Sequence, residues 1–249
     1  MNRSNLIIFI VPTTQTPFFA ELTYQMQRSL KKAAGIITIS YSDFSENLIN
    51  DLPIVSIEKQ ISETIPCVSS DNYMGGRLAA RKLVDSGASC LLIITRTTDK
   101  TITNYGERTR GFVDYCNENN ISYKEFNSKT HEDKFFGELS TFLKKEYHHN
   151  KPFDGLFAVA DQYADFSLDV LKQCGYHSPE DIQIIGFDGG KMYEYQNNPL
   201  SSIRQPIPKM VTTCVDILEG ILEGHASYTD KKIVLPVEFI QGKTTKRNS

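Results

Sequence analysis

Residues 153–190, FDGLFAVADQYADFSLDVLKQCGYHSPEDIQIIGFDGG, decide how the rest of the chain is interpreted. The apolar run at 153–159 has the length and composition of a buried strand, and its pattern breaks at Asp161. Apolar residues then recur at helical spacing as far as Gly175, a residue suited to a helix C-terminus. A second apolar run ends at Asp188. The stretch therefore predicts a strand, a helix and a second strand, with the two strands parallel.

Asp161 and Asp188 each stand where a predicted strand stops. In open α/β sheets ligands gather beyond the carboxyl ends of the strands, so we expect both side chains to face one crevice. Simpler roles stay open for both residues. Asp161 can cap the helix that follows it, and Asp188 can serve only a turn.

Apolar runs alternate with amphipathic segments along the rest of the chain, which predicts a doubly wound α/β architecture. Further strands are expected at 6–11, 36–39, 53–57, 67–69, 91–95, 122–126, 200–204 and 233–240. Further helices are expected at 17–30, 73–86, 105–119, 135–143 and 206–223. Gly75 and Gly76 lower the helix propensity of their segment and so predict close backbone packing there.

The composition limits the class of protein. The 249 residues are 40% hydrophobic and 23% charged, as in ordinary globular proteins, and fill one large domain or two lobes. A net charge of −3 argues against a nucleic-acid-binding surface in this segment. The apolar runs are too short to cross a bilayer, and the N-terminus does not resemble a secretory signal. We therefore expect a cytoplasmic protein without a membrane partner.

The cysteines and the common catalytic motifs give no sign of a metal or cofactor. The five cysteines are odd in number and lie in apolar patterns, which predicts reduced, buried thiols. No glycine-rich phosphate loop, nucleophile elbow or zinc-protease motif is present. His148 and His149 are adjacent, so on a helix their side chains diverge and favour an exposed helix end over a metal pair. We expect no metal, no cofactor and no catalytic residue.

What remains is a set of polar and aromatic residues at strand ends, loop edges and a helix start. The candidates are Phe18, Phe19, Asp71, Arg108, Asp161, Asp188 and Gln205. Carboxylates accept paired hydroxyl donors, a guanidinium supplies a fork of donors, and aromatic faces cover the apolar side of a sugar ring. An arginine near an aspartate favours the charged carboxylate, which suits holding hydroxyls better than donating a proton. The set predicts a polyhydroxylated ligand, although Arg108 alone can also be a solvated helix charge.

Five motifs carry a resemblance to a known family. They are VPTTQTPFFAEL, SSDNYMGGRLAARKLVDSGA, ERTRGF, the run from ADQYA to SPEDIQIIGFDG, and LSSIRQP. In this order and over nearly the whole chain they resemble the effector-binding core of the lactose-repressor (LacI/GalR) family of bacterial transcription regulators. The resemblance implies a periplasmic-binding-protein type I fold, with two Rossmann-like lobes of parallel sheets joined by three crossovers. Residues 1–95 and 206–228 would form the N-terminal lobe, and residues 96–205 and 229–249 the C-terminal lobe.

The resemblance also implies roles for particular residues. Phe18 and Phe19 match the helix start that touches the ligand, and Asp71 matches the acidic position before the D-N-x-x-G-G helix. In the other lobe, Arg108 matches the effector-binding arginine, Asp188 matches the aspartate of the G-F-D turn, and Gln205 lies on a crossover beside the cleft. The relatives often carry Asn where this chain has Ala160, which removes one polar contact and leaves the effector's identity open.

Two departures from the family pattern affect the expected function. The helix-turn-helix and hinge helix do not precede the first strand, so we expect a fragment of a longer regulator that does not bind operator DNA by itself. Family members also carry a further strand and helix where QMQRSL here runs directly into KKAAGIITIS. This unit is either deleted or missing from the sequence as we have it. We favour the second reading, because deletion would expose a sheet edge.

The function implied is that of a cytoplasmic repressor of a carbohydrate-utilisation operon. A sugar or sugar phosphate would bind between the lobes, and a homodimer would transmit the change to its DNA-binding domains. Charge reversal at Arg108, or Asp188→Ala, is expected to weaken sugar binding without unfolding the domain. Two alternatives stay open. One is an extracytoplasmic solute-binding protein of the same fold, and the other is a sugar hydrolase with Asp71 and Asp188 as paired carboxylates.

Overall fold

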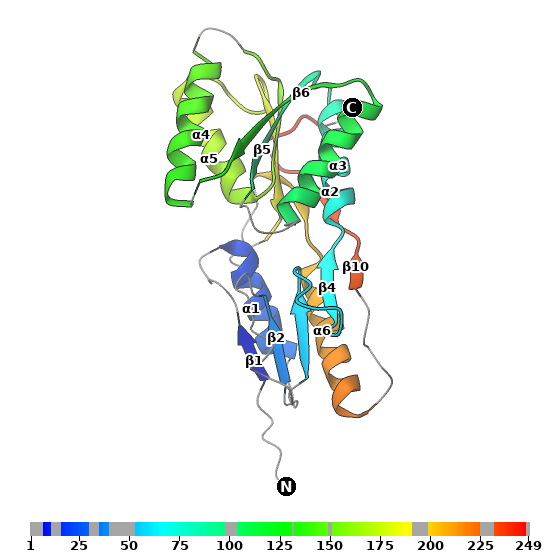
Figure 1. Ribbon diagram of the computed structural model, residues 1–249. Coiled ribbons are helices and arrows are strands. Elements are labelled where there is room, and N and C mark those ends of the chain that lie inside the picture. Colours follow the sequence, from blue (N-terminus) through cyan, green and yellow to red (C-terminus); the bar gives the residue numbers. More distant parts are fainter. Residues whose placement is uncertain are drawn as a thin grey trace. The chain divides into compact units, whose positions relative to one another are not determined.

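The chain divides into two compact units, which we describe separately (Figure 1). The computed structural model describes residues 7–10, 16–29, 35–39, 53–97, 104–130, 132–148, 151–190, 199–224 and 232–247. Unit 1 comprises residues 1–71, 190–194 and 206–236, and unit 2 comprises residues 72–189, 195–205 and 237–249. The polypeptide passes between the main segments of the two units after Asp71, Gln205 and Pro236. These passages are the three expected crossovers.

Unit 1 is built on a parallel sheet with the strand order β1-β2-β3-β4-β10. Its strands are β1 (Ile7–Ile10), β2 (Gly35–Thr38), β3 (Ile54–Ile57), β4 (Cys67–Ser70) and β10 (Lys232–Leu235). Its helices are α1 (Pro17–Ser29) and α6 (Ile207–Leu222), and α6 packs on β3, β4 and α1. Because both strands and helices bury apolar residues such as Leu22, Ile37 and Leu218, the unit has its own core. The Leu30–Lys31 junction, where the family's further strand and helix are expected, lies outside the described residues.

Unit 2 is built on a larger sheet with the strand order β11-β9-β8-β7-β5-β6. Its strands are β5 (Cys90–Arg96), β6 (Ser122–Ser128), β7 (Gly155–Ala158), β8 (Gln183–Asp188), β9 (Ser201–Arg204) and β11 (Glu238–Ile240). Figure 1 shows α2 (Asn72–Asp85) and α3 (Asn104–Glu118) on one face of this sheet, and α4 (Glu132–Glu146) and α5 (Asp161–Gln173) on the other. The predicted strand, helix, strand unit is confirmed as β7, α5 and β8, with β7 and β8 parallel. Gly175 has the expected positive φ of 86° just beyond α5.

Two sequence-based expectations about this architecture are wrong. The division between the units falls after Asp71 and not after residue 95, because α2 packs on α3 and β5 pairs with β6 and β7. The single strand expected at 233–240 is two strands, β10 in unit 1 and β11 in unit 2. Pro236 between them lacks a backbone N–H and cannot continue a ladder. The β11 strand pairs with β9 in the antiparallel sense, so the sheet of unit 2 is not wholly parallel.

Close backbone packing at the glycines of α2 is confirmed. A Cβ atom on Gly76 would overlap the main-chain carbonyl of Arg108 in α3, and one on Gly111 of α3 would overlap the carbonyl of Tyr73 in α2. A Cβ atom on Gly75 would lie 2.5 Å from the ring of Phe187. The two helices therefore approach each other as closely as their backbones allow, and this approach sets the position of Arg108.

The cysteines are less uniformly buried than the sequence predicts. Cys67, Cys116 and Cys214 are buried, and burial raises the pKa of each thiol, to about 12 for Cys116. Cys90 and Cys174 are half-buried, so the expectation of burial is wrong for these two. All five are free thiols. Among the described residues, no helix is both long enough and apolar enough to span a membrane.

Substitution of Gly76 by alanine is expected to destabilise unit 2. The added methyl group meets main-chain atoms that cannot move aside without separating α2 from α3, so we expect a loss of about 2–3 kcal/mol or more. Gly137→Ala in α4 is the matched control, since nothing lies within 4 Å of its added Cβ and alanine favours the helix. Urea denaturation of both variants measures the difference. Equal stability of the two variants would contradict this account of the helix pair.

Candidate functional site

The carboxyl ends of three neighbouring strands in unit 2 carry a cluster of polar groups. Asp188 ends β8, Gln205 follows β9, and the carbonyl of Val159 follows β7. Arg108 reaches this edge from α3, and Asn72 from the first turn of α2. This is the edge at which open α/β sheets bind ligands.

Arg108 is the centre of the cluster. Its side chain is only 4% exposed. The Nε group donates a hydrogen bond to Asn72 Oδ1 at 2.7 Å, and Nη1 donates to the Val159 carbonyl at 2.7 Å and to Asp188 Oδ1 at 3.3 Å. The guanidinium carbon lies 3.6 Å from the centre of the Phe187 ring. The alternative that Arg108 is a solvated helix charge is therefore wrong.

Hydrogen bonds hold both the side chain and the main chain of Asp188 in place. Gln205 donates from Nε2 to Asp188 Oδ1 at 2.8 Å, and its backbone N–H donates to the Asp188 carbonyl at 3.0 Å. The Asp188 backbone has φ of 118°, a conformation that residues with a side chain rarely adopt. Its side chain remains 23% exposed. The site therefore presents part of one carboxylate beside a buried guanidinium and a primary amide.

Asp161 lies next to Asp188, but its carboxylate is engaged within the protein. Oδ1 accepts a hydrogen bond from the Ser202 hydroxyl at 2.6 Å, and Oδ2 accepts one from the Gly189 N–H at 2.8 Å. The N-cap of α5 is Ala160, without a side-chain cap bond, so the alternative in which Asp161 caps the helix is wrong. Burial, followed by the nearby charge of Asp188, raises the pKa of the Asp161 carboxyl well above its usual range.

The other predicted site residues belong to unit 1. Phe18 is buried in the core of that unit and meets Phe19 edge to face, with ring centres 5.1 Å apart. The Asp71 N–H donates a hydrogen bond to the Leu235 carbonyl at 2.8 Å, where β4 meets β10. Because the two units are described separately, an effector contact for these three residues stays a prediction.

Sequence reasoning missed the residues that support the site from inside. The sequence assigns no role to Asn72, although its side chain accepts a hydrogen bond from Arg108. Ser202 is fully buried and binds Asp161, but β9 carries serine at two consecutive positions, so the sequence does not single out Ser202. A polar residue at an inward-facing strand position was the one available signal.

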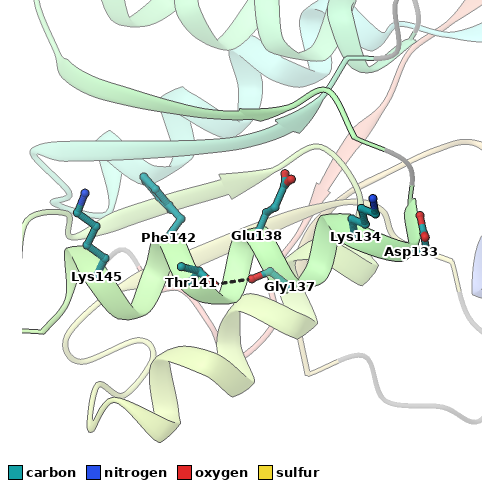
Figure 2. Close-up of a pocket in the computed structure, with 7 residues that line it drawn as sticks. All are labelled: Asp133, Lys134, Gly137, Glu138, Thr141, Phe142 and Lys145. Carbon is teal, nitrogen blue, oxygen red and sulfur yellow. Dashed lines mark hydrogen bonds between the residues drawn. The ribbon is translucent and has the colours of Figure 1, made fainter.

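A surface depression along α4 is a poorer candidate (Figure 2). Its lining residues are Asp133, Lys134, Gly137, Glu138, Thr141, Phe142 and Lys145. Glu138 accepts a hydrogen bond from Ser128 at 2.8 Å, and Thr141 donates to the Gly137 carbonyl at 2.9 Å. The depression is open to solvent and its polar groups are partly engaged locally, so it lacks the convergent groups of a specific site. Within the described ranges, no group of side chains is arranged to hold a metal ion.

Comparison with known proteins assigns this fold to a class. Residues 80–245 match the family model of the periplasmic binding protein-like domain. The ribose operon repressor of Lactococcus lactis is 29% identical over 274 aligned positions, which cover 98% of this chain and 81% of the relative. The sucrose operon repressor of Streptococcus mutans is 30% identical over 90% of this chain and 67% of the relative.

A solved structure agrees with these relatives. The periplasmic binding protein/LacI transcriptional regulator from Alkaliphilus metalliredigens, complexed with D-xylulofuranose, superposes with a TM-score of 0.83 and 25% identity. The match covers 98% of this chain and 100% of that structure. This chain therefore belongs to the periplasmic binding protein-like domain family and, within it, to the lactose-repressor (LacI/GalR) type of transcriptional regulator. The alignment of 274 positions with the ribose operon repressor exceeds the 249 residues of this chain, so that relative carries residues that this chain lacks.

The burial of Arg108 revises the expectation that its charge can be reversed without unfolding. Arg108→Glu places a carboxylate against the Val159 carbonyl and Asp188, so we expect unit 2 to lose about 3–5 kcal/mol of stability. Arg110→Gln is the matched control, because the Arg110 side chain is 60% exposed and its ion pair with Glu107 contributes at most about 1 kcal/mol. Urea denaturation should separate the two variants, and near-equal midpoints would contradict the buried network.

The raised pKa of Asp161 predicts a pH dependence of stability. Between the usual value of 3.8 and the raised pKa, the folded protein binds the proton more tightly than the unfolded chain does. The contribution of Asp161 to stability is therefore greatest at low pH and falls as pH rises through this window. Asp161→Asn should remove the slope, which thermal unfolding of both proteins at a series of pH values measures. Parallel pH profiles would refute the assignment.

Proposed function

We propose that this chain is the effector-binding domain of a cytoplasmic, LacI/GalR-type repressor of a carbohydrate-utilisation operon. The effector would be a small polyhydroxylated molecule, most simply a sugar. The observation that carries the proposal is the cluster of Arg108, Asp188 and Gln205 at the carboxyl ends of the strands of unit 2. The relatives named above support it, because they are repressors of the ribose and sucrose operons.

The chemistry of the cluster suits hydroxyl groups. The exposed part of the Asp188 carboxylate can accept hydrogen bonds from one or two sugar hydroxyls. Arg108 and Gln205 hold that carboxylate in place, so a ligand meets acceptors that are already oriented. Since Asp188 is paired with a guanidinium, it is suited to holding hydroxyls and not to transferring protons. We therefore propose binding without catalysis, in preference to a sugar hydrolase.

Regulation would follow from a difference in affinity between two conformations. An effector that binds one arrangement of the domain more tightly shifts the equilibrium toward it. We propose that a homodimer transmits this shift to operator DNA through a helix-turn-helix domain outside these 249 residues. An extracytoplasmic solute-binding protein of the same fold is the alternative. Fractionation of cells that produce the native gene product distinguishes the two, since the repressor stays in the cytoplasm.

A ligand screen tests the proposed function. We expect one or more compounds from a panel of sugars and sugar phosphates to raise the melting temperature of the chain, because a ligand at about 100 times its Kd adds about 2.7 kcal/mol of stability. Calorimetry with the best compound should then show at least a tenfold loss of affinity in Asp188→Ala, the loss expected when a hydrogen bond to a charged group is removed.

Asp169→Asn is the matched control for the screen, since Asp169 is an exposed carboxylate on α5 in the same unit. Its affinity for the sugar should equal that of the unmodified chain. Unchanged affinity in a folded Asp188→Ala variant would defeat the assignment of the site. Turnover of a sugar by the purified chain would defeat the proposal of binding without catalysis.

A further inference from the structure

The turn at the end of β8 needs to be held in place. Asp188 and Gly189 both have positive φ, 118° and 61°, and for Asp188 this conformation is unfavourable in the free chain. The direction of the Asp188 side chain depends on the peptide plane that joins these two residues. Whatever fixes that peptide therefore also fixes the carboxylate that faces the effector.

Contacts from β9 and from α5 hold the turn that contains this peptide. On the side of β9, the Gln205 N–H donates to the Asp188 carbonyl at 3.0 Å, and Arg204 Nε donates to the Gly189 carbonyl at 3.2 Å. On the side of α5, Asp161 Oδ2 accepts the N–H of Gly189 at 2.8 Å. This N–H belongs to the peptide bond that follows Asp188. Asp161 thus binds the N–H of the peptide whose carbonyl Gln205 binds, and together they hold the orientation of the turn.

The surroundings of Asp161 are arranged to receive its carboxyl group. The fully buried Ser202 of β9 donates its hydroxyl to Oδ1 at 2.6 Å. A Cβ atom on Gly186 of β8 would overlap Asp161 Oδ1, so the glycine leaves the space that the carboxyl occupies. Three elements, α5, β8 and β9, therefore meet at this group.

We propose that Asp161 is a positioning residue of the effector site, which holds the Asp188–Gly189 turn through the Gly189 N–H and is itself held by Ser202. The inference rests on the proposed function, because it concerns the same site. It replaces the expectation that Asp161 touches the effector directly. Both carboxylate oxygens of Asp161 are bound to the protein, whereas the Asp188 side chain is 23% exposed.

The charged groups around Asp161 come from each element that packs on it. Asp188 at the end of β8 and Asp165 on α5 both disfavour its charged form, while Arg204 at the end of β9 binds the other face of the same turn. The hydrogen bonds from Ser202 and Gly189 favour the carboxylate. A change in the protonation of Asp161 therefore changes the strength of the hydrogen bond that the Gly189 N–H donates.

The test combines affinity with a spectroscopic signature. Asp161→Ala leaves the Gly189 N–H without its acceptor and should weaken binding of the sugar found in the screen at least tenfold. Asp161→Asn should restore most of the affinity, because its Oδ1 can accept from Gly189 while its Nδ2 donates to the Ser202 hydroxyl. The amide proton of Gly189 should titrate with pH in the NMR spectrum of the unmodified chain and lose that titration in Asp161→Asn.

Ser167→Ala is the matched control for a purely structural effect. Ser167 is a fully buried serine of the same helix, and among the described residues its hydroxyl donates to the Tyr163 carbonyl of its own helix, at 2.6 Å. It should cost stability but leave the sugar affinity unchanged. If Asp161→Ala is folded and binds the sugar as tightly as the unmodified chain, the positioning role is wrong. If Asp161→Ala does not fold, Asp161→Asn decides by its affinity and its Gly189 resonance.

The outcomes separate this inference from the function on which it rests. If no compound binds the unmodified chain, the proposed function fails, and the Gly189 resonance alone decides whether Asp161 holds the turn. A Gly189 resonance that does not change with pH, or that is the same in Asp161→Asn, overturns the inference. Sugar binding that depends on Asp188 but not on Asp161 overturns the inference and leaves the proposed function intact.

Discussion

A buried positive charge organises the larger unit of this protein. The guanidinium of Arg108 cannot leave water without partners, and it obtains them from α2, from the end of β7 and from the end of β8. Each hydrogen-bond acceptor comes from a different part of the chain. Pairing the Arg108 guanidinium with all of them therefore requires α2, α3 and the ends of β7 and β8 to come together. The polar edge of the sheet is a consequence of that requirement.

Small residues make the arrangement possible. Gly76 and Gly111 let α2 and α3 approach until their backbones touch, which brings Asn72 within reach of Arg108. Gly186 leaves room in β8 for the carboxyl group of Asp161. In the helix pair the absent side chains leave room for main-chain carbonyl groups, and in β8 the absent side chain leaves room for the Asp161 carboxyl group. The stability of the fold and the geometry of the site therefore depend on the same positions.

The site combines groups of two kinds. Arg108 and Gln205 orient the carboxylate of Asp188, which is the group that reaches the surface of unit 2. The two carboxylate oxygens of Asp161 are instead hydrogen-bonded to Gly189 and Ser202 of the protein. Binding of a neutral hydroxylated ligand at such an edge needs little rearrangement of the carboxylate itself. On the proposed function, discrimination among sugars would be left to the shape of the surroundings, including Ala160 at the N-cap of α5.

The sequence by itself determined the elements of this fold and the family motifs, because apolar periodicity and turn residues are local properties. It identified β7, α5 and β8 and the candidates Arg108 and Asp188 in this way. Only the tertiary structure decided which sheet each strand joins, since an apolar run such as β5 has the same pattern in either unit. It also decided that the Arg108 side chain is buried and that the carboxylate of Asp161 turns inward to the Gly189 N–H. The direction of a side chain depends on the partners that distant segments bring to it, and these partners leave no pattern in the neighbouring sequence.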